Sequence, residues 1–221
     1  MMRQPYLFFD LDGTLTDPKV GITKSVAHAL EYYGIHVEDP DVLCPFIGPP
    51  LTDSFQEFYG LTMEQAREGV LKFREYFEVT GLYENQVYPG MESTLARLQA
   101  AGFRLMVATS KPEAFAKKIL EHFHMDGFFQ FIGGADMEET RVRKGDVIRY
   151  VLEQNQITDL SSVIMIGDRK HDILGAKEQG LRSIGVLYGY GDREELTAAG
   201  ADWIAEDVSD LERIVNGLWI K

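Results

Sequence analysis

The sequence is poor in cysteine and has no long apolar run. Cys44 is the only cysteine among 221 residues, which excludes an intrachain disulfide and fits a reducing compartment. No apolar run approaches the roughly 20 residues that a membrane-spanning helix needs. The apolar run near the N-terminus is too short for a secretory signal and ends in an acid. We therefore expect a cytoplasmic protein that does not interact with a membrane.

Positive charge is also scarce. The chain has 22 lysines and arginines against 35 aspartates and glutamates, a formal net charge of −13. Such an acidic surface repels nucleic acid, so a nucleic acid polymer is not an expected partner. It also repels phosphorylated compounds, so any phosphate site needs cations of its own. The composition is compatible with a monomer or a homodimer.

Short apolar runs alternate with amphipathic segments over most of the chain. The apolar runs at 6–9, 105–108, 163–166 and 183–187 lack polar alternation, which is typical of strands covered on both faces. Helical patterns occur at 91–101, 112–123, 144–154 and 209–218. This order predicts an α/β fold with a doubly wound, Rossmann-like parallel sheet.

The segment 18–83 breaks this alternation. Its apolar spacing predicts helices at 20–33, 51–59 and 62–79, and no strand. We therefore expect an inserted all-helical subdomain at 18–83, with 1–17 and 84–221 forming the Rossmann-like core.

Acids, hydroxyls and an amine follow the ends of the expected strands. They are Asp10 and Asp12 after the first strand, Thr109, Ser110 and Lys111 after the second, and Asp168 and Asp172 after the third, with Lys144 at the start of the helix before the third strand. In open α/β sheets, ligands bind outside the carboxyl ends of the strands. These side chains are therefore expected to share one crevice.

Four of these residues offer carboxylates. Asp10, Asp12, Asp168 and Asp172 supply hard oxygen donors, which suit Mg²⁺. Asp10 could then attack phosphorus as a nucleophile. Asp12 could protonate the leaving oxygen and later activate water.

The remaining groups suit a phosphate. Thr109, Ser110 and Lys144 could hold phosphate oxygens, and a cation with Lys144 would reduce the repulsion between phosphate and carboxylate. Gly13 lets the chain turn sharply beside them, and we include it in the phosphate-binding group. Each motif alone has a structural explanation, such as a turn or a helix cap, but four of them in order at strand ends favour a site.

Together these motifs resemble those of the haloacid dehalogenase superfamily of phosphatases over essentially the whole chain. The run Asp-Leu-Asp-Gly-Thr at 10–14 matches the first family motif, Thr109-Ser110 the second, Lys144 the third, and Gly167-Asp168 with Asp172 the fourth. The resemblance implies that Asp10 is the nucleophile and Asp12 the general acid and base. It also implies that Mg²⁺ is held by the Asp10 carboxylate, the Asp12 carbonyl and Asp168, with support from Asp172.

The helical insert resembles the cap of the phosphoglycolate phosphatase-like branch, which implies a small phosphorylated metabolite as substrate. Asp17-Pro18 departs from the Asp-Ser of phosphoglycolate phosphatases. The loop Phe-Ile-Gly-Pro-Pro at 46–50 is similar to that of chains labelled 5′-nucleotidases. Phe46, Lys24 and Arg74 are the candidate substrate contacts in the insert.

Three alternatives to a phosphoglycolate phosphatase-like enzyme stay open. A 5′-nucleotidase shares the same core chemistry. A sugar phosphomutase would carry an arginine in the loop 46–50, which has no cation here. A receiver-like phosphorylation switch would be about half this length and would lack an acid at the position of Asp12.

Overall fold

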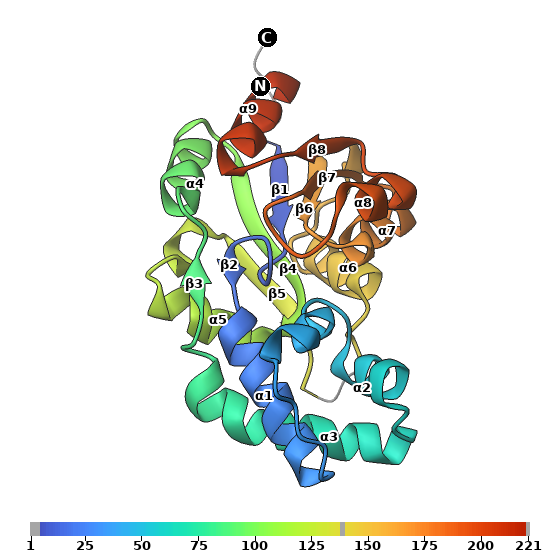
Figure 1. Cartoon of the computed structure of the whole chain (residues 1–221). Coiled ribbons are helices and arrows are strands. Elements are labelled where there is room, and N and C mark those ends of the chain that lie inside the picture. The colour runs from blue at the N-terminus through green and yellow to red at the C-terminus, as the bar shows by residue number, and fades with distance from the viewer. Residues whose placement is uncertain (1–4, 138–139, 220–221) are drawn as a thin grey trace. The chain divides into compact units, whose positions relative to one another are not determined.

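The computed structural model describes residues 5–137 and 140–219 (Figure 1). The chain forms two compact units, one made of Met1–Asp17 with Val87–Lys221 and the other of Pro18–Gln86. Among the described residues, no helix is long and apolar enough to cross a membrane.

The first unit contains a six-stranded parallel sheet in the order β5-β4-β1-β6-β7-β8. The strands are β1 (Tyr6–Phe9), β4 (Arg104–Pro112), β5 (Phe131–Ala135), β6 (Val163–Gly167), β7 (Arg182–Val186) and β8 (Trp203–Ala205). This confirms the predicted α/β parallel-sheet fold. The sequence does not predict β5 or β8, because β5 contains two adjacent glycines and β8 has only three residues.

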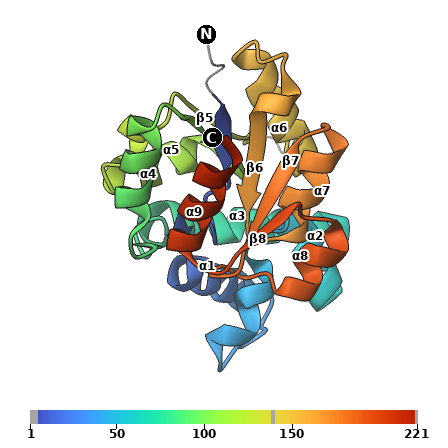
Figure 2. The same ribbon diagram turned by 90° about the horizontal axis from the view of Figure 1, so that it is seen from above.

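Helices cover both faces of this sheet (Figure 2). One face carries α4 (Met91–Ala100), α5 (Glu113–His122) and α9 (Val208–Trp219), and the other carries α6 (Lys144–Gln154), α7 (Lys170–Glu178) and α8 (Arg193–Ala199). Two short 3₁₀ segments, Asp126–Phe128 and Leu160–Ser162, also belong to the described part of this unit. This two-sided cover explains why the strands are apolar at consecutive positions.

The central strand β1 fixes the register of the sheet. Phe8 pairs with Met106 of β4 on one side and with Met165 of β6 on the other, and all three side chains are buried. They pack with Val147 and Val151 of α6 in the main hydrophobic core. Because the strands are parallel, their carboxyl ends lie at one edge of the sheet, where β1, β4 and β6 deliver the polar residues of the site.

The second unit is built from helices, as its apolar spacing predicts. It contains α1 (Lys19–Tyr32), a 3₁₀ segment (Pro40–Phe46), α2 (Leu51–Tyr59), α3 (Met63–Tyr76) and a π-helical turn (Phe77–Gly81). The start of α3 is a capping box in which the Thr62 hydroxyl accepts from the Gln65 N–H and the Gln65 side chain accepts from the Thr62 N–H. Where the chain passes between the units, β2 (Thr16–Asp17) and β3 (Gln86–Val87) form a two-stranded sheet.

Candidate active site

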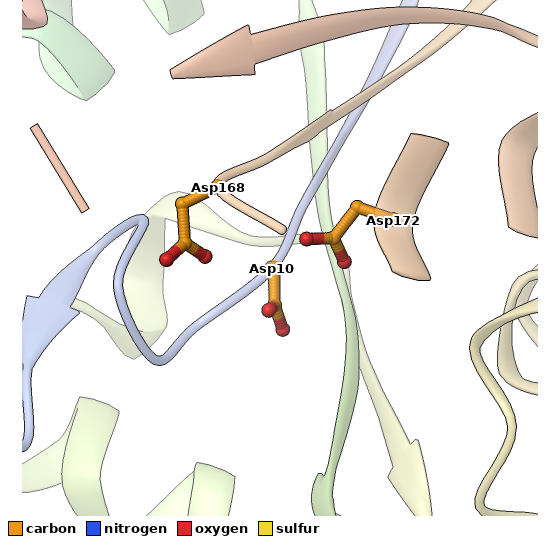
Figure 3. Close-up of side chains that lie close together, drawn as sticks. All are labelled: Asp10, Asp168 and Asp172. Carbon is orange, nitrogen blue, oxygen red and sulfur yellow. The ribbon is translucent and has the colours of Figure 1, made fainter. Parts of the chain in front are cut away.

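Three buried carboxylates lie together at the carboxyl end of the sheet (Figure 3). Asp10 directly follows β1, Asp168 directly follows β6, and Asp172 lies in the first turn of α7. One carboxylate oxygen from each lies within 4.8 Å of the others. The Asp10 N–H donates to the Ile166 carbonyl at 2.9 Å, which continues the β1–β6 pairing by one residue and fixes Asp10 at this edge. The structure thus brings together three of the four predicted metal-ligating acids as a group.

The turn after Asp10 is shaped around Asp168. Gly13 has φ +81°, and a Cβ at this position would lie 2.1 Å from Asp168 Oδ2. On its other side Asp168 meets Gly189, where a Cβ would lie 2.4 Å from Asp168 Cβ. The Thr14 hydroxyl donates to Asp168 Oδ1 at 3.3 Å, and the Tyr190 N–H donates to Oδ2 at 2.8 Å. Both glycines therefore make room for a carboxylate whose two oxygens are held in place.

Lys144 lies at the start of α6 and is buried against the acids. Its Nζ lies 2.8 Å from Asp10 Oδ1 and 2.8 Å from Asp172 Oδ1, and it donates to the Ala108 carbonyl at 3.0 Å. Burial lowers the pKa of Lys144, but the two carboxylates outweigh burial and raise the pKa above its ordinary value. The side chain therefore stays charged at neutral pH and offers a cation beside Asp10, as its position in the sequence predicts.

Asp12 does not belong to the three-acid group and pairs with Lys111 instead. Lys111 Nζ lies 2.7 Å from Asp12 Oδ2. Burial raises the pKa of Asp12, although the charge of Lys111 acts in the opposite direction. The sequence places Lys111 at this edge of the sheet but assigns it no role, because most lysines are exposed. The available signal is its position two residues after Thr109, on the same side of an extended strand.

Thr109 and Ser110 occupy the carboxyl end of β4. The pairing of β4 with β5 changes register between Ala108 and Pro112, an irregularity of the kind that redirects side chains beside active sites. The buried Thr109 hydroxyl accepts from the Lys111 N–H at 3.2 Å, so its own hydrogen can be donated elsewhere. Ser110 is only half-buried.

Residues 7–186 match the family described as Haloacid dehalogenase-like hydrolase. The chain belongs to this family. The match confirms the resemblance that the motifs indicate and includes all the acids, hydroxyls and lysines described above.

The curated relatives include phosphatases and one protein named as a kinase. A 5′-nucleotidase of Pseudomonas aeruginosa is 44% identical over 97% of this chain and 97% of its own length. A phosphoglycolate phosphatase of Vibrio parahaemolyticus is 31% identical over 94% of both chains. The tyrosine-protein kinase PtkA of Mycobacterium tuberculosis is 38% identical over 84% of this chain, and the match spans only 62% of that protein.

Solved structures share the fold throughout. The crystal structure of a predicted phosphatase from Clostridium acetobutylicum is 46% identical, with a TM-score of 0.95, and the match covers 97% of this chain and 99% of that one. The haloacid dehalogenase-like fold with an inserted helical region is therefore established for this chain. The chain is a haloacid dehalogenase-like phosphatase that acts on phosphorylated substrates.

The charges of this phosphatase site fit a divalent cation. Burial raises the pKa of Asp168, and the nearby Asp172 and Asp10 carboxylates raise it further. Burial also raises the pKa of Asp172, to about 6, against the lowering effect of Lys144. A divalent cation among Asp10, Asp168 and Asp172 would offset the mutual repulsion of these carboxylates. Oxygen donors of this kind suit Mg²⁺.

The candidate substrate contacts of the second unit lie in different surroundings. Phe46 is buried among the rings of Phe55, Phe58 and Tyr59, so its side chain packs inside this unit. The Lys24 ammonium pairs with Glu84, which also accepts from the Tyr76 hydroxyl. Arg74 is half-buried on α3. A role for Phe46, Lys24 or Arg74 in substrate binding stays a prediction.

Proposed function

We propose that this chain hydrolyses small phosphomonoesters with Mg²⁺ and forms an aspartyl-phosphate on Asp10. The observation that carries this proposal is the position of Asp10 at the carboxyl end of the sheet. Its carboxylate lies 2.8 Å from a buried lysine ammonium and within 4.8 Å of the oxygens of two further buried acids. Lys144 and a cation at this point would neutralise the carboxylate and the incoming phosphate, which otherwise repel each other.

Asp10, Asp168 and Asp172 supply the side chains that would hold Mg²⁺, and the family resemblance adds the Asp12 backbone carbonyl. When bound, Mg²⁺ would supply Lewis-acid polarisation of the phosphoryl oxygens. Thr109, Ser110 and Lys144 would bind the other phosphate oxygens. The sequence predicts Gly13 as part of this phosphate-binding group. A side chain at this position would also clash with the Asp168 carboxylate.

The reaction balances in two steps. First, an Asp10 carboxylate oxygen bonds to phosphorus, the bond to the leaving oxygen breaks, and the Asp12 carboxyl gives its proton to that oxygen. Second, a water oxygen bonds to phosphorus, the Asp12 carboxylate takes its proton, and the bond between phosphorus and Asp10 breaks. The products are an alcohol and inorganic phosphate, and both aspartates return to their starting forms.

The core handles the phosphoryl group, so the second unit is the proposed determinant of the leaving group. We propose Pro18–Gln86 as this cap, with Phe46, Lys24 and Arg74 as its first candidates. Nucleoside 5′-monophosphates are favoured as substrates, because the relative called a 5′-nucleotidase is 44% identical over nearly the whole chain, cap included. Phosphoglycolate is the second candidate, supported by a relative at 31% identity. A cytoplasmic location stays part of the proposal.

Phosphate release from a panel of phosphomonoesters tests the function. The panel includes nucleoside 5′-monophosphates, phosphoglycolate and sugar phosphates, each with and without Mg²⁺. We expect multiple turnovers that require Mg²⁺ and disappear in Asp10→Asn, with an unchanged circular dichroism spectrum. Activity of Asp10→Asn equal to that of the wild type would refute the mechanism. A long-lived phosphorylated protein without turnover would instead support a phosphorylation switch.

A further inference from the structure

The ion pair between Lys111 and Asp12 has no role in the mechanism above, although it is one of the most buried in the molecule. The side chains of Lys111 and Asp12 are only 6% and 11% exposed, and Nζ lies 2.7 Å from Oδ2. Both residues belong to the first unit, which is also the unit that contains Asp10. Asp12, one member of this pair, is the residue that would transfer protons in both steps of the proposed reaction.

Burying a lysine ammonium costs free energy, so a buried lysine is stable only where it forms a well-oriented ion pair. The backbone of Lys111 provides this orientation, because the residue is part of β4 and its N–H donates to the Thr109 hydroxyl at 3.2 Å. The change of register between Ala108 and Pro112 fixes how this part of the strand is turned. The Lys111 ammonium thus reaches Asp12 from a rigid strand, unlike a lysine on an exposed helix.

The two oxygens of Asp12 differ in their surroundings. Oδ2 is bound to the Lys111 ammonium, whereas Oδ1 is buried and has no hydrogen-bond partner within the part of the chain that the structure describes. A carboxyl group that transfers a proton needs one oxygen directed at the reacting atom and a fixed orientation of the group as a whole. The asymmetry of Asp12 matches this requirement.

We propose that Lys111 is a positioning residue, which holds Asp12 by Oδ2 so that Oδ1 makes the proton transfers to the leaving group and from water. This inference rests on the proposed function, in which Asp12 is the general acid and base. Lys111 then acts through Asp12 and leaves the attack by Asp10 unchanged. Its loss should matter only where a proton must move.

Substrates with leaving groups of different basicity distinguish an effect on proton transfer by Asp12 from an effect on the attack by Asp10. An alkoxide leaving group needs a proton from Asp12 as the phosphorus–oxygen bond breaks, whereas p-nitrophenolate leaves without one. For Lys111→Met we expect kcat/KM to fall about 100-fold or more on the alkyl phosphomonoester that the wild type hydrolyses best. On p-nitrophenyl phosphate, kcat/KM should fall less than about 10-fold.

The second step gives an independent readout. Because Lys111→Met would form the phosphorylated Asp10 from p-nitrophenyl phosphate but hydrolyse it slowly, rapid mixing should show a burst of one p-nitrophenol per enzyme. Lys111→Arg, which keeps the charge, should restore part of the rate on the alkyl substrate. Lys117→Met is the matched control, because Lys117 pairs with Glu113 on the exposed surface of α5, and its rates should equal those of the wild type.

Equal losses of kcat/KM on the two substrates would overturn the inference, and so would unchanged rates or a Lys111→Arg variant no better than Lys111→Met. If Lys111→Met does not fold, as judged by near-ultraviolet circular dichroism, Lys111→Gln undergoes the same comparison with the same criteria. Failure of the proposed function has a different signature, since the wild type itself would then release no phosphate from any member of the panel.

Discussion

Replacing Gly13 by alanine tests whether the turn after β1 is built around the Asp168 carboxylate. The new Cβ would lie 2.1 Å from Asp168 Oδ2, 2.5 Å from Cγ and 2.7 Å from Oδ1. Asp168 has little room to move, because Gly189 also packs against its side chain: a Cβ on Gly189 would lie 2.4 Å from Asp168 Cβ and 2.5 Å from Oδ2. The carboxylate must therefore rotate, or the turn must move.

The expected loss of stability has two parts. Alanine at the φ of +81° found at Gly13 costs about 1–2 kcal/mol. Displacing the carboxylate of Asp168 breaks a hydrogen bond from the Thr14 hydroxyl or the Tyr190 N–H, and bonds to charged groups contribute about 1.5–3 kcal/mol. The free energy of unfolding of Gly13→Ala should therefore fall by about 2.5–5 kcal/mol.

Gly102→Ala is the matched control. Gly102 lies in the same unit with φ +93°, but a Cβ there would meet nothing within 4 Å. This variant should lose only the backbone part, about 1–2 kcal/mol. Urea denaturation gives both free energies of unfolding, and thermal melting with increasing Mg²⁺ shows whether the acid cluster still binds the cation.

The comparison has a clear refuting result. If Gly13→Ala is no less stable than Gly102→Ala and still gains stability from Mg²⁺ like the wild type, Asp168 does not depend on the space that glycine leaves. A loss of Mg²⁺ stabilisation confined to Gly13→Ala would instead show that this space positions a metal-ligating carboxylate.

Three further predictions concern the Mg²⁺ ion, the buried Lys144 and the N-terminal capping box of α3. Mg²⁺ at a hundredfold excess over its Kd should raise the free energy of unfolding by about 2.7 kcal/mol, as measured by urea denaturation. Because the pKa of Asp172 is raised to about 6, its carboxyl gains a proton as the pH falls through this value. The increase in unfolding free energy caused by Mg²⁺ should therefore be full above pH 7 and shrink towards pH 5. An equal increase at both pH values would contradict this prediction. Lys144→Met leaves Asp10 and Asp172 without their shared partner and should cost about 3–5 kcal/mol and abolish phosphate release, whereas stability equal to that of the wild type would show that the pair contributes nothing. Thr62→Ala removes the cap of α3 and should lower the unfolding free energy by about 1 kcal/mol, with kcat unchanged on p-nitrophenyl phosphate.

The parts of the fold that the sequence predicts are those with a strong local pattern. The apolar run at 6–9 and the acids after it identify β1, because a strand buried on both faces has no polar alternation. The spacing in α3 and its capping box is equally local. In contrast, β5 has the sequence Phe-Ile-Gly-Gly-Ala, and it forms a strand through its packing against β4, α5 and α6.

In the site, too, some residues can be predicted from the local sequence and others only from the tertiary structure. Asp10, Lys144 and Asp168 can be identified from the sequence, because strand ends of a parallel sheet converge at one edge. The loop 189–191 cannot, since its contacts with Asp168 depend on how β7 and β6 are ordered in the sheet. Phe46 is the opposite case, because this aromatic residue of a loop that the sequence predicts to contact substrate packs against the rings of its own helices.

Lys111 shows why buried charges need the structure. In the sequence its position at the end of a strand separates it from Lys117, which lies in the next helix, but does not show that it pairs with Asp12. The pairing arises from the turn of β4 that brings Nζ to Asp12, a residue 99 positions earlier in the chain. An acidic protein that must attract a phosphate dianion needs its few cations at the acids that do the chemistry. Lys144 beside Asp10 and Lys111 beside Asp12 meet this need, so the two acids that act in the proposed reaction each have a lysine of their own.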